Sequence, residues 1–295
     1  MKNILVIGSV YTEIVNEVKE LPKGNEEFET LSTNTKVNGE GFLATLLLQK
    51  FGFQYTSTLV VGQGYYSTQI KEELDQYDIP YMQKDEMNGC VYTLVDQKNQ
   101  STKMLVPGCE YELDLNDLQE IDASSITNVL LFGDMLCGSH SEDIIQVLDD
   151  LDKPILFIPN GRIDDIDENI FDSIMALQPE LYLSDTESYY LLGSEDINIK
   201  DGAKAISDET KQLVLIYKQG LGIYVQDTKE RRLLAQSNAF DATMLVCAYA
   251  LARYSGLSVY NSLVYADEFT QKYQEEGIED ISEGKELLAR LILGK

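Results

Sequence analysis

The segment that leads into a long apolar helix near the C-terminus carries the side chain best suited to chemistry. A polar stretch, 237–241, ends on Asp241, and residues 242–251 after it are almost all apolar. An aspartate at this place stabilises a helix N-terminus through the helix dipole. The same helix end offers free N–H groups that bind a phosphate or a developing anion, and a carboxylate there can accept a proton from an alcohol. The pattern therefore indicates either a simple helix cap or a site for phosphoryl transfer.

Other motifs for chemistry are absent or incomplete. The single histidine, His140, has Ser139 beside it, but no Gly-x-Ser-x-Gly elbow supports a hydrolase, and we interpret His140 as a loop or cap residue. One histidine and four scattered cysteines argue against a zinc site. Gly62 and Gly64 follow a strand and open a helix, as a dinucleotide fingerprint does. Ser67 stands in place of the third glycine, so we interpret the segment as a tight turn.

The charge balance narrows the possible partners. Lys and Arg number 23 and Asp and Glu number 50, so the formal net charge is −27. A chain this acidic repels phosphate backbones and anionic lipid surfaces, and we expect neither a nucleic acid nor a membrane as a partner. The first apolar run, Ile4–Ile7, is too short for the core of a signal peptide. No stretch approaches the roughly 18 apolar residues of a transmembrane helix, and we expect a cytoplasmic protein with reduced thiols.

Strand-like and helix-like segments alternate along most of the 295 residues. Short, wholly apolar runs predict strands buried on both faces, and longer apolar or amphipathic runs predict helices. The predicted strands are Ile4–Ile7, Thr58–Val61, Asn128–Phe132, Pro154–Ile158, Leu181–Leu183 and Leu213–Tyr217, and the predicted helices are Phe42–Phe51, Tyr66–Tyr77, Ser141–Leu151, Asn169–Leu177, Thr186–Leu192 and Ala239–Tyr254. This alternation predicts an α/β fold in which a mostly parallel central sheet has helices on both faces.

Two regions, 13–36 and 89–106, break this alternation. Both contain stretches with a period of two, such as Phe28–Leu31 and Val91–Val95, beside turn-forming residues. We predict antiparallel strands outside the main sheet, which form a lid over a ligand at the carboxyl edge of the parallel strands. A small lid cannot bury its own apolar face, so we expect a homodimer that pairs two lids.

Five motifs follow one another along the chain: Gly8–Glu13; Asn38–Gly52, with Gly39, Gly41 and a helix; Leu183–Glu187; Asn238–Asp241; and Gly256–Ser258 after the long helix. In type and order they resemble the motifs of the ribokinase-like, or PfkB, carbohydrate kinases, over nearly the whole length. The resemblance implies one ribokinase-like domain over residues 1–295 with a three-layer α/β/α architecture, and lid segments at about 13–36 and 89–106. It also implies a kinase that uses ATP and Mg²⁺ to phosphorylate a hydroxyl of a sugar or polyol.

The resemblance further implies roles for individual residues. Asp241 matches the catalytic base, and the backbone N–H groups around Ala239 and Phe240 match the anion hole for the transferring phosphoryl group. Glu187 matches the glutamate that holds Mg²⁺, usually through water. The positions that match sugar contacts are Glu13, Gly39 and Leu43, and those that match the surroundings of the nucleotide are Ser184 and Gly222.

Several positions depart from the family pattern. Asn238 and Phe240 replace the two glycines of the anion hole, although glycine best allows close backbone approach and positive φ. Ser184 replaces the asparagine of the magnesium motif. Glu40 and Leu43 replace a lysine and a sugar-binding asparagine. Leu43 offers a hydroxyl no hydrogen bond, so we expect ribose to be a poor ligand.

The sequence leaves two main functions open. Retention of Asp241 and Glu187 favours an ATP-dependent carbohydrate kinase. Loss of the glycines favours a catalytically impaired relative that binds a small molecule or acts in regulation. An unrelated doubly wound protein is a third interpretation. We favour the kinase, because the candidate base lies at the correct end of its helix.

Overall fold

The computed structural model describes residues 3–98, 100–194, 198–218, 222–226, 231–235 and 241–294. A central sheet of eight strands runs in the spatial order β14 (Arg231–Ala235), β13 (Gly222–Gln226), β12 (Val214–Lys218), β11 (Glu180–Ser184), β10 (Ile155–Ile158), β9 (Ile126–Phe132), β1 (Asn3–Ile7) and β4 (Gln54–Ser57). The strands from β12 to β4 are parallel, whereas β13 and β14 join them through antiparallel pairing. The predicted mostly parallel sheet is confirmed.

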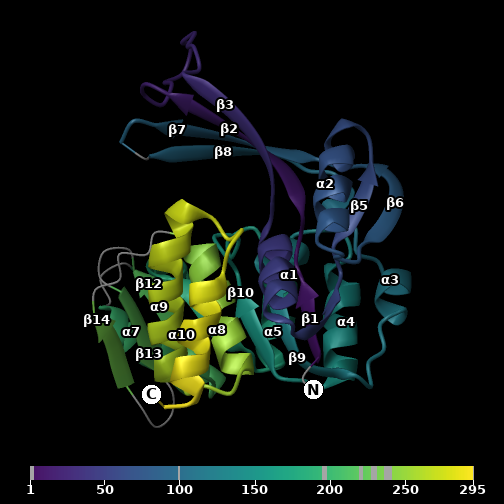
Figure 1. The fold of residues 1–295 in the computed structure, drawn as a ribbon. Helices are drawn as coiled ribbons and strands as arrows, with labels where there is room; N and C mark the ends of the chain where they lie inside the picture. The colour runs from purple at the N-terminus through teal and green to yellow at the C-terminus, as the bar shows by residue number, and fades with distance from the viewer. Residues whose placement is uncertain are drawn as a thin grey trace.

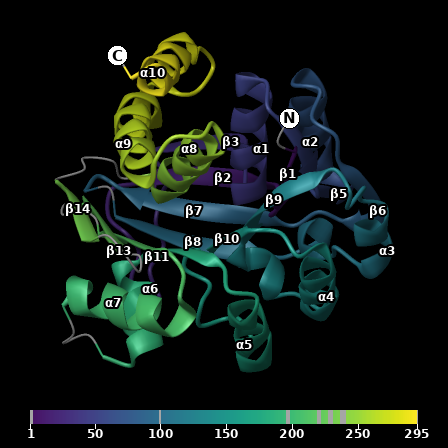
Figure 2. The ribbon, with the colours of Figure 1, turned by 90° about the horizontal axis from the view of Figure 1, so that it is seen from below.

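Helices cover both faces of this sheet (Figures 1 and 2). One face carries α1 (Glu40–Phe51), α8 (Ala242–Tyr254), α9 (Val259–Glu276) and α10 (Ser282–Ile292), and the other carries α4 (Ser141–Leu151), α5 (Glu168–Ala176), α6 (Asp185–Leu192) and α7 (Ile199–Thr210). Alternate residues of β1 enter the two cores: Ile4 packs under the first layer and Leu5 under the second. This three-layer arrangement confirms the predicted α/β/α architecture. In the described ranges, no helix combines the length and apolar composition needed to cross a bilayer.

A second sheet projects from the body as a lid (Figure 1). Its strands lie in the order β3 (Ser32–Asn38), β2 (Tyr11–Val18), β7 (Cys90–Asp96) and β8 (Ser101–Val106). Beside it lie α2 (Tyr65–Gln76) and a two-stranded sheet of β5 (Val60–Gln63) and β6 (Met82–Met87), and α3 (Leu115–Gln119) follows in the chain. The lid strands come from the two regions in which the sequence departs from the α/β alternation.

Three details of the prediction are wrong. The segment Phe28–Leu31 is not a strand: β3 starts at Ser32, which pairs with Glu17. The Leu31 N–H still donates to the Glu17 carbonyl of β2, but β2 ends one residue later, so the residues before Leu31 have no partner strand. The lid is not wholly antiparallel, because β2 and β7 run parallel. The strand predicted at 58–61 shares only two residues with β5, which belongs to the small two-stranded sheet, and the central-sheet strand of this region is β4.

A close contact between two glycines fixes the position of the α1 N-terminus. Gly8 follows β1, and Gly41 lies in the first turn of α1. A Cβ atom on Gly8 would lie 2.8 Å from the backbone of Gly41, and a Cβ on Gly41 would collide with the Gly8 carbonyl group. The Phe42 N–H also donates a hydrogen bond of 3.2 Å to the Ser9 carbonyl oxygen. Side chains at these two positions would therefore move α1 away from the edge of the sheet.

We predict that Gly41→Ala lowers the free energy of unfolding by about 1–3 kcal/mol, because the added methyl group overpacks a contact between backbone atoms. Urea unfolding measures this change. Gly24→Ala is the matched control, since a Cβ there meets no atom within 4 Å. Equal losses in the two variants would show that the glycine contact does not constrain the fold.

Candidate functional site

A cavity of about 360 Å³ lies between the lid and the carboxyl ends of the central strands. This size suits a small molecule. The lid contributes Tyr11, Val91, Lys103 and Leu105, and the body contributes Glu40, Tyr111, Asp134, Asn160, Gly161, Arg162 and Thr243. Parallel strands bring their carboxyl ends to one edge, which is why polar residues that follow β9 and β10 meet the first turns of α1 and α8.

Two carboxylates, Glu40 and Asp134, form one wall of this cavity. Glu40 Oε1 accepts a hydrogen bond of 2.6 Å from Asn160 Nδ2. Asp134 accepts hydrogen bonds from the Ser9 hydroxyl and, at 3.0 Å, from the Met135 N–H. Burial and then the charge of Glu40 raise the pKa of Asp134 to about 7, and burial also raises the pKa of Glu40. Both effects oppose joint ionisation of the two acids.

Glu13 is a third acid close to the cavity, but its charge is already compensated. It lies in β2 and is only 3% exposed. Its carboxylate accepts hydrogen bonds from Thr93 (2.5 Å) and Asn38 (2.6 Å) and lies 3.3 Å from Lys36 Nζ and 3.9 Å from Lys103 Nζ. Burial opposes its ionisation, yet these donors and lysines outweigh burial and lower the pKa of Glu13. Glu13 is therefore a charged residue that holds the lid strands together.

Glu187 and Ser184 form the N-terminus of α6 through a reciprocal capping box. The Glu187 N–H donates to Ser184 Oγ at 3.2 Å, and the Ser184 N–H donates to Glu187 Oε2 at 2.7 Å. The other carboxylate oxygen accepts a 2.7 Å hydrogen bond from the N–H of Gly161, which lines the cavity. Each Glu187 oxygen thus already holds one backbone donor, and the residue ties α6 to the loop after β10.

Asp241 caps α8 beside the cavity. Its Oδ1 accepts a hydrogen bond of 2.8 Å from the Met244 N–H, as a helix cap should, and Thr243 in the first turn of α8 lines the cavity. Burial and then the charges of Asp241 and Glu40 raise the pKa of Cys247, so both acids lie near this residue of α8. The structure therefore brings Asp241 to the same edge of the sheet as Glu40.

The remaining predicted site residues are distributed around this edge. Gly39 is the N-cap of α1 at φ 127°, and a side chain there would collide with the Ser9 carbonyl oxygen. Leu43 packs against the core and is not among the residues that line the cavity. Gly222 begins β13, opposite Lys218. The predicted anion hole at 239–240, together with residue 238, lies outside the described residues.

Sequence reasoning missed several residues of the cavity wall. Asp134 lies in a short 3-10 turn, Gly133–Leu136, directly after β9, and Asn160 follows β10 by two residues. Each lies two residues after the apolar end of a strand, and a polar residue at that place is a signal that finds both of them. Tyr11 and Tyr111 carry no such signal, because their contribution depends on the position of the lid.

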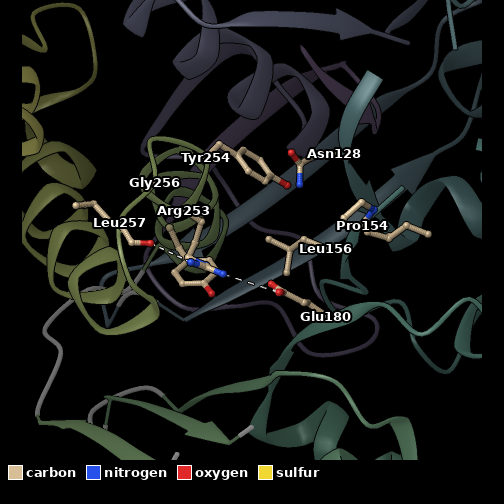
Figure 3. Close-up of a pocket in the computed structure, with 10 residues that line it drawn as sticks. Asn128, Pro154, Leu156, Glu180, Arg253, Tyr254, Gly256 and Leu257 are labelled. Carbon is tan, nitrogen blue, oxygen red and sulfur yellow. Dashed lines mark hydrogen bonds and ion pairs between the residues drawn. The ribbon is translucent and has the colours of Figure 1, made fainter. Parts of the chain in front are cut away.

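A second cavity, of about 210 Å³, lies at the opposite, amino ends of the central strands (Figure 3). Asn128, Pro154 and Glu180 from three strand starts face the last turn of α8 across it. The Arg253 guanidinium donates a 2.9 Å hydrogen bond to the Leu257 carbonyl and lies 4.0 Å from Glu180 Oε1. Glu180, the acid of this second cavity, therefore has the Arg253 guanidinium beside it.

Comparison with solved structures identifies the fold. The chain is similar to ribokinase from Thermotoga maritima (TM-score 0.78, 18% identity, 98% of this chain and 100% of that one). It is also similar to Arabidopsis thaliana ribokinase complexed with ribose and ATP (0.76, 18%, 98% and 99%) and to Burkholderia thailandensis nucleoside kinase in complex with inosine (0.76, 13%, 98% and 98%). No family model and no curated protein matches the sequence. These likenesses show that the chain has the ribokinase-like fold, as the sequence motifs indicate.

We predict that stability depends on the ionisation of Asp134. Its pKa rises from 3.8 in the unfolded chain to about 7 in the folded protein, so the folded protein binds more protons between these pH values. The free energy of unfolding therefore falls as pH rises through this range. Asp134→Asn should reduce that fall by about 1 kcal/mol or more, because one pKa unit corresponds to about 1.4 kcal/mol.

Urea unfolding at about pH 4.5 and about pH 8 tests this dependence. Asp172→Asn, an exposed change of the same type in α5, should leave the pH dependence as it is in the wild type. The same pH dependence in Asp134→Asn and in the wild type would contradict the prediction.

Proposed function

We propose that this protein is an ATP- and Mg²⁺-dependent kinase that transfers the γ-phosphoryl group to a hydroxyl of a sugar or polyol. The observation that carries the proposal is the position of Asp241, which caps α8 two residues before Thr243, a residue that lines the lid cavity. The ribose, ATP and inosine in the similar solved structures support the same class of activity.

Asp241 has the chemistry of a general base for this reaction. The substrate hydroxyl transfers its proton to the carboxylate while its oxygen forms the new bond to the γ-phosphorus, and the bond to the ADP oxygen breaks. The N-terminus of α8 favours the negative charge that develops on the transferring group. The lid residues Val91 and Leu105 cover the cavity and limit the access of water.

The residues present fit a magnesium ion that is bound through water. In the described part of the chain, no group of three acidic, histidine or cysteine side chains could hold a metal directly. Each Glu187 oxygen accepts one backbone hydrogen bond, and a carboxylate oxygen has a further lone pair for a water molecule. Mg²⁺ usually keeps several waters and takes other ligands from phosphates, whose charge it neutralises. Glu187 would hold such a water, and Ser184 and Gly222 would lie near the nucleotide.

A second candidate function is binding or regulation without efficient phosphoryl transfer. Asn238 and Phe240 stand where the family pattern has glycines, and their side chains hinder close approach of the backbone to a phosphate. This candidate keeps the cavity and the ligand but assigns Asp241 only its role as a helix cap.

We predict that Asp241→Asn reduces turnover by about 10²- to 10⁴-fold, the usual contribution of a general base. Asparagine caps a helix about as well as aspartate, so the free energy of unfolding should change little. A coupled assay for ADP with a panel of sugars and polyols measures turnover, and calorimetry measures ATP-Mg²⁺ binding, which should be retained.

Asp167→Asn is the matched control, because Asp167 caps α5 in the same way, by accepting a 2.9 Å hydrogen bond from Asn169 N–H. It should keep full turnover. Equal turnover in Asp241→Asn and the wild type would exclude Asp241 as the base. A wild type that binds sugars but turns none over would favour the second candidate function.

We also propose that two copies of the chain pair through their lids. Strand β8 is exposed along its whole length, and the apolar residues Met104 and Leu31 are exposed on the lid and at its edge. The outer strands β3 and β8 also leave one backbone edge each without a partner in the described chain. A second copy of the same lid would cover both features.

We predict that Leu31→Lys weakens dimerisation by about 100-fold or more, since each buried leucine contributes about 1.5–3 kcal/mol and a dimer buries two of them. Leu293→Lys, an equally exposed leucine at the far end of the chain, is the control. Light scattering over a range of concentrations measures the assembly. A monomeric wild type at micromolar concentration would contradict the proposal.

A further inference from the structure

Among the residues that the structure describes, the lid cavity is lined by two cations and two acids that form no ion pair with one another. Its two cations have acidic partners elsewhere: Lys103 Nζ lies 3.9 Å from Glu13, and Arg162 Nε lies 3.2 Å from Asp165. Its two acids, Glu40 and Asp134, have no Lys, Arg or His nitrogen within 4.0 Å among the described residues. Glu40 is bound instead by the neutral amide of Asn160, and Asp134 by neutral donors. The second cavity differs, because its Glu180 lies beside Arg253.

The α1 N-terminus and the neutral donors do not remove the need for a countercharge. Burial raises the pKa of Glu40 even though the helix end, its N–H group and the charge of Lys103 favour the ionised form, and burial also raises the pKa of Asp134. Two carboxylates that resist ionisation together are stabilised by a cation placed between them. Lys103 and Arg162 line the same cavity but are paired with Glu13 and Asp165, so a cationic group of a ligand would supply the charge in direct contact with the two acids.

The Tyr11 hydroxyl is a further hydrogen-bond acceptor in the lining of the same cavity. Its side chain is 6% exposed and lines the cavity, yet its hydroxyl makes no hydrogen bond to another described residue. Burial, followed by the charges of Glu40 and Glu13, raises its pKa, so this hydroxyl stays neutral. A hydroxyl in the cavity lining that has no partner among the described residues is a polar group to which a ligand can hydrogen bond.

We infer that the substrate of this cavity carries a protonated amine, which binds between Glu40 and Asp134 with the Tyr11 hydroxyl as a third acceptor. An ammonium group has three donors and no acceptor, which matches two carboxylates and a phenol. A bare divalent cation fits less well, because hard cations take about six oxygen ligands, and no cluster of three acidic, His or Cys side chains stands here among the described residues. Amino sugars and amino polyols are the corresponding substrate class, and this inference rests on the proposed function.

Binding of matched pairs tests the inference without requiring turnover. The pairs are 2-amino-2-deoxyglucose with glucose, and 1-amino-1-deoxysorbitol with sorbitol, and N-acetylglucosamine serves as the neutral amide. Calorimetry on the full chain, with and without ATP-Mg²⁺, should show that the amine of at least one pair binds about tenfold tighter or more than its hydroxyl partner and its amide, because charge-assisted hydrogen bonds are roughly twice as strong as neutral ones.

Two variants test whether the preference for amines depends on Glu40 and Asp134. Glu40→Gln and Asp134→Asn should each remove most of the amine preference, and either alone suffices if the other does not fold. Glu142→Gln makes the same change in the first turn of α4, at an exposed position away from the cavity, and should leave the preference unchanged. Circular dichroism confirms that each variant is folded.

Equal binding of amines and hydroxyls by the wild type, or an amine preference that survives both variants, would overturn the inference. Binding of Mg²⁺ alone that is lost in Glu40→Gln and excludes the amine would also overturn it. If the protein phosphorylates neutral sugars and shows no preference for amines, the proposed function is supported and the inference about the amine is refuted. Amine binding without turnover of any compound refutes the kinase and supports the inference.

Discussion

Two adjacent residues after β10, Asn160 and Gly161, hold the edge of the sheet together. The Asn160 side chain donates to Glu40 at the start of α1, and the Gly161 N–H donates to Glu187 at the start of α6. These helices lie on opposite faces of the sheet (Figure 2). Since every parallel strand ends at this edge, the helices that follow also begin near it, and the loop after β10 joins their acidic N-termini into one wall.

The acids at this edge of the sheet differ in the donors and cations that compensate their buried charge. Glu13 is held by two hydrogen bonds and two lysines, Glu187 by two backbone N–H groups, and Asp241 by the Met244 N–H. Among the described residues, neutral donors alone bond to Glu40 and Asp134, and burial raises the pKa of both acids. An arrangement that keeps two poorly compensated acids in one cavity costs stability, and such costs concentrate where a protein binds or reacts.

The sequence predicts the body of the fold well and the lid less well. Buried parallel strands are wholly apolar, so Ile4–Ile7 and Pro154–Ile158 predict β1 and β10 to within a residue. The lid has few buried neighbours, and its strand limits depend on which partner lies opposite, as the start of β3 at Ser32 shows. Helices α9 and α10, whose apolar residues are diluted by charged ones, are not predicted at all.

Prediction of the site is limited for a different reason. Asp241 is recognisable because a local pattern, a polar cap before a long apolar helix, surrounds it. Asp134 is one of 50 acidic residues, and nothing within a few positions distinguishes it except the end of a strand. The hydrogen bond that it accepts comes from Ser9, and the charge that helps to raise its pKa is that of Glu40; both residues are more than 90 positions away in the sequence.

The short link between β1 and β2 couples the lid to this acidic wall. Only Gly8, Ser9 and Val10 separate the two strands, and Ser9 donates its hydroxyl to Asp134 while its carbonyl accepts the Phe42 N–H of α1. Tyr11, the next residue, begins the lid and lines the cavity. A side chain in the lid and an acid in the body are therefore held by neighbouring residues of one backbone segment.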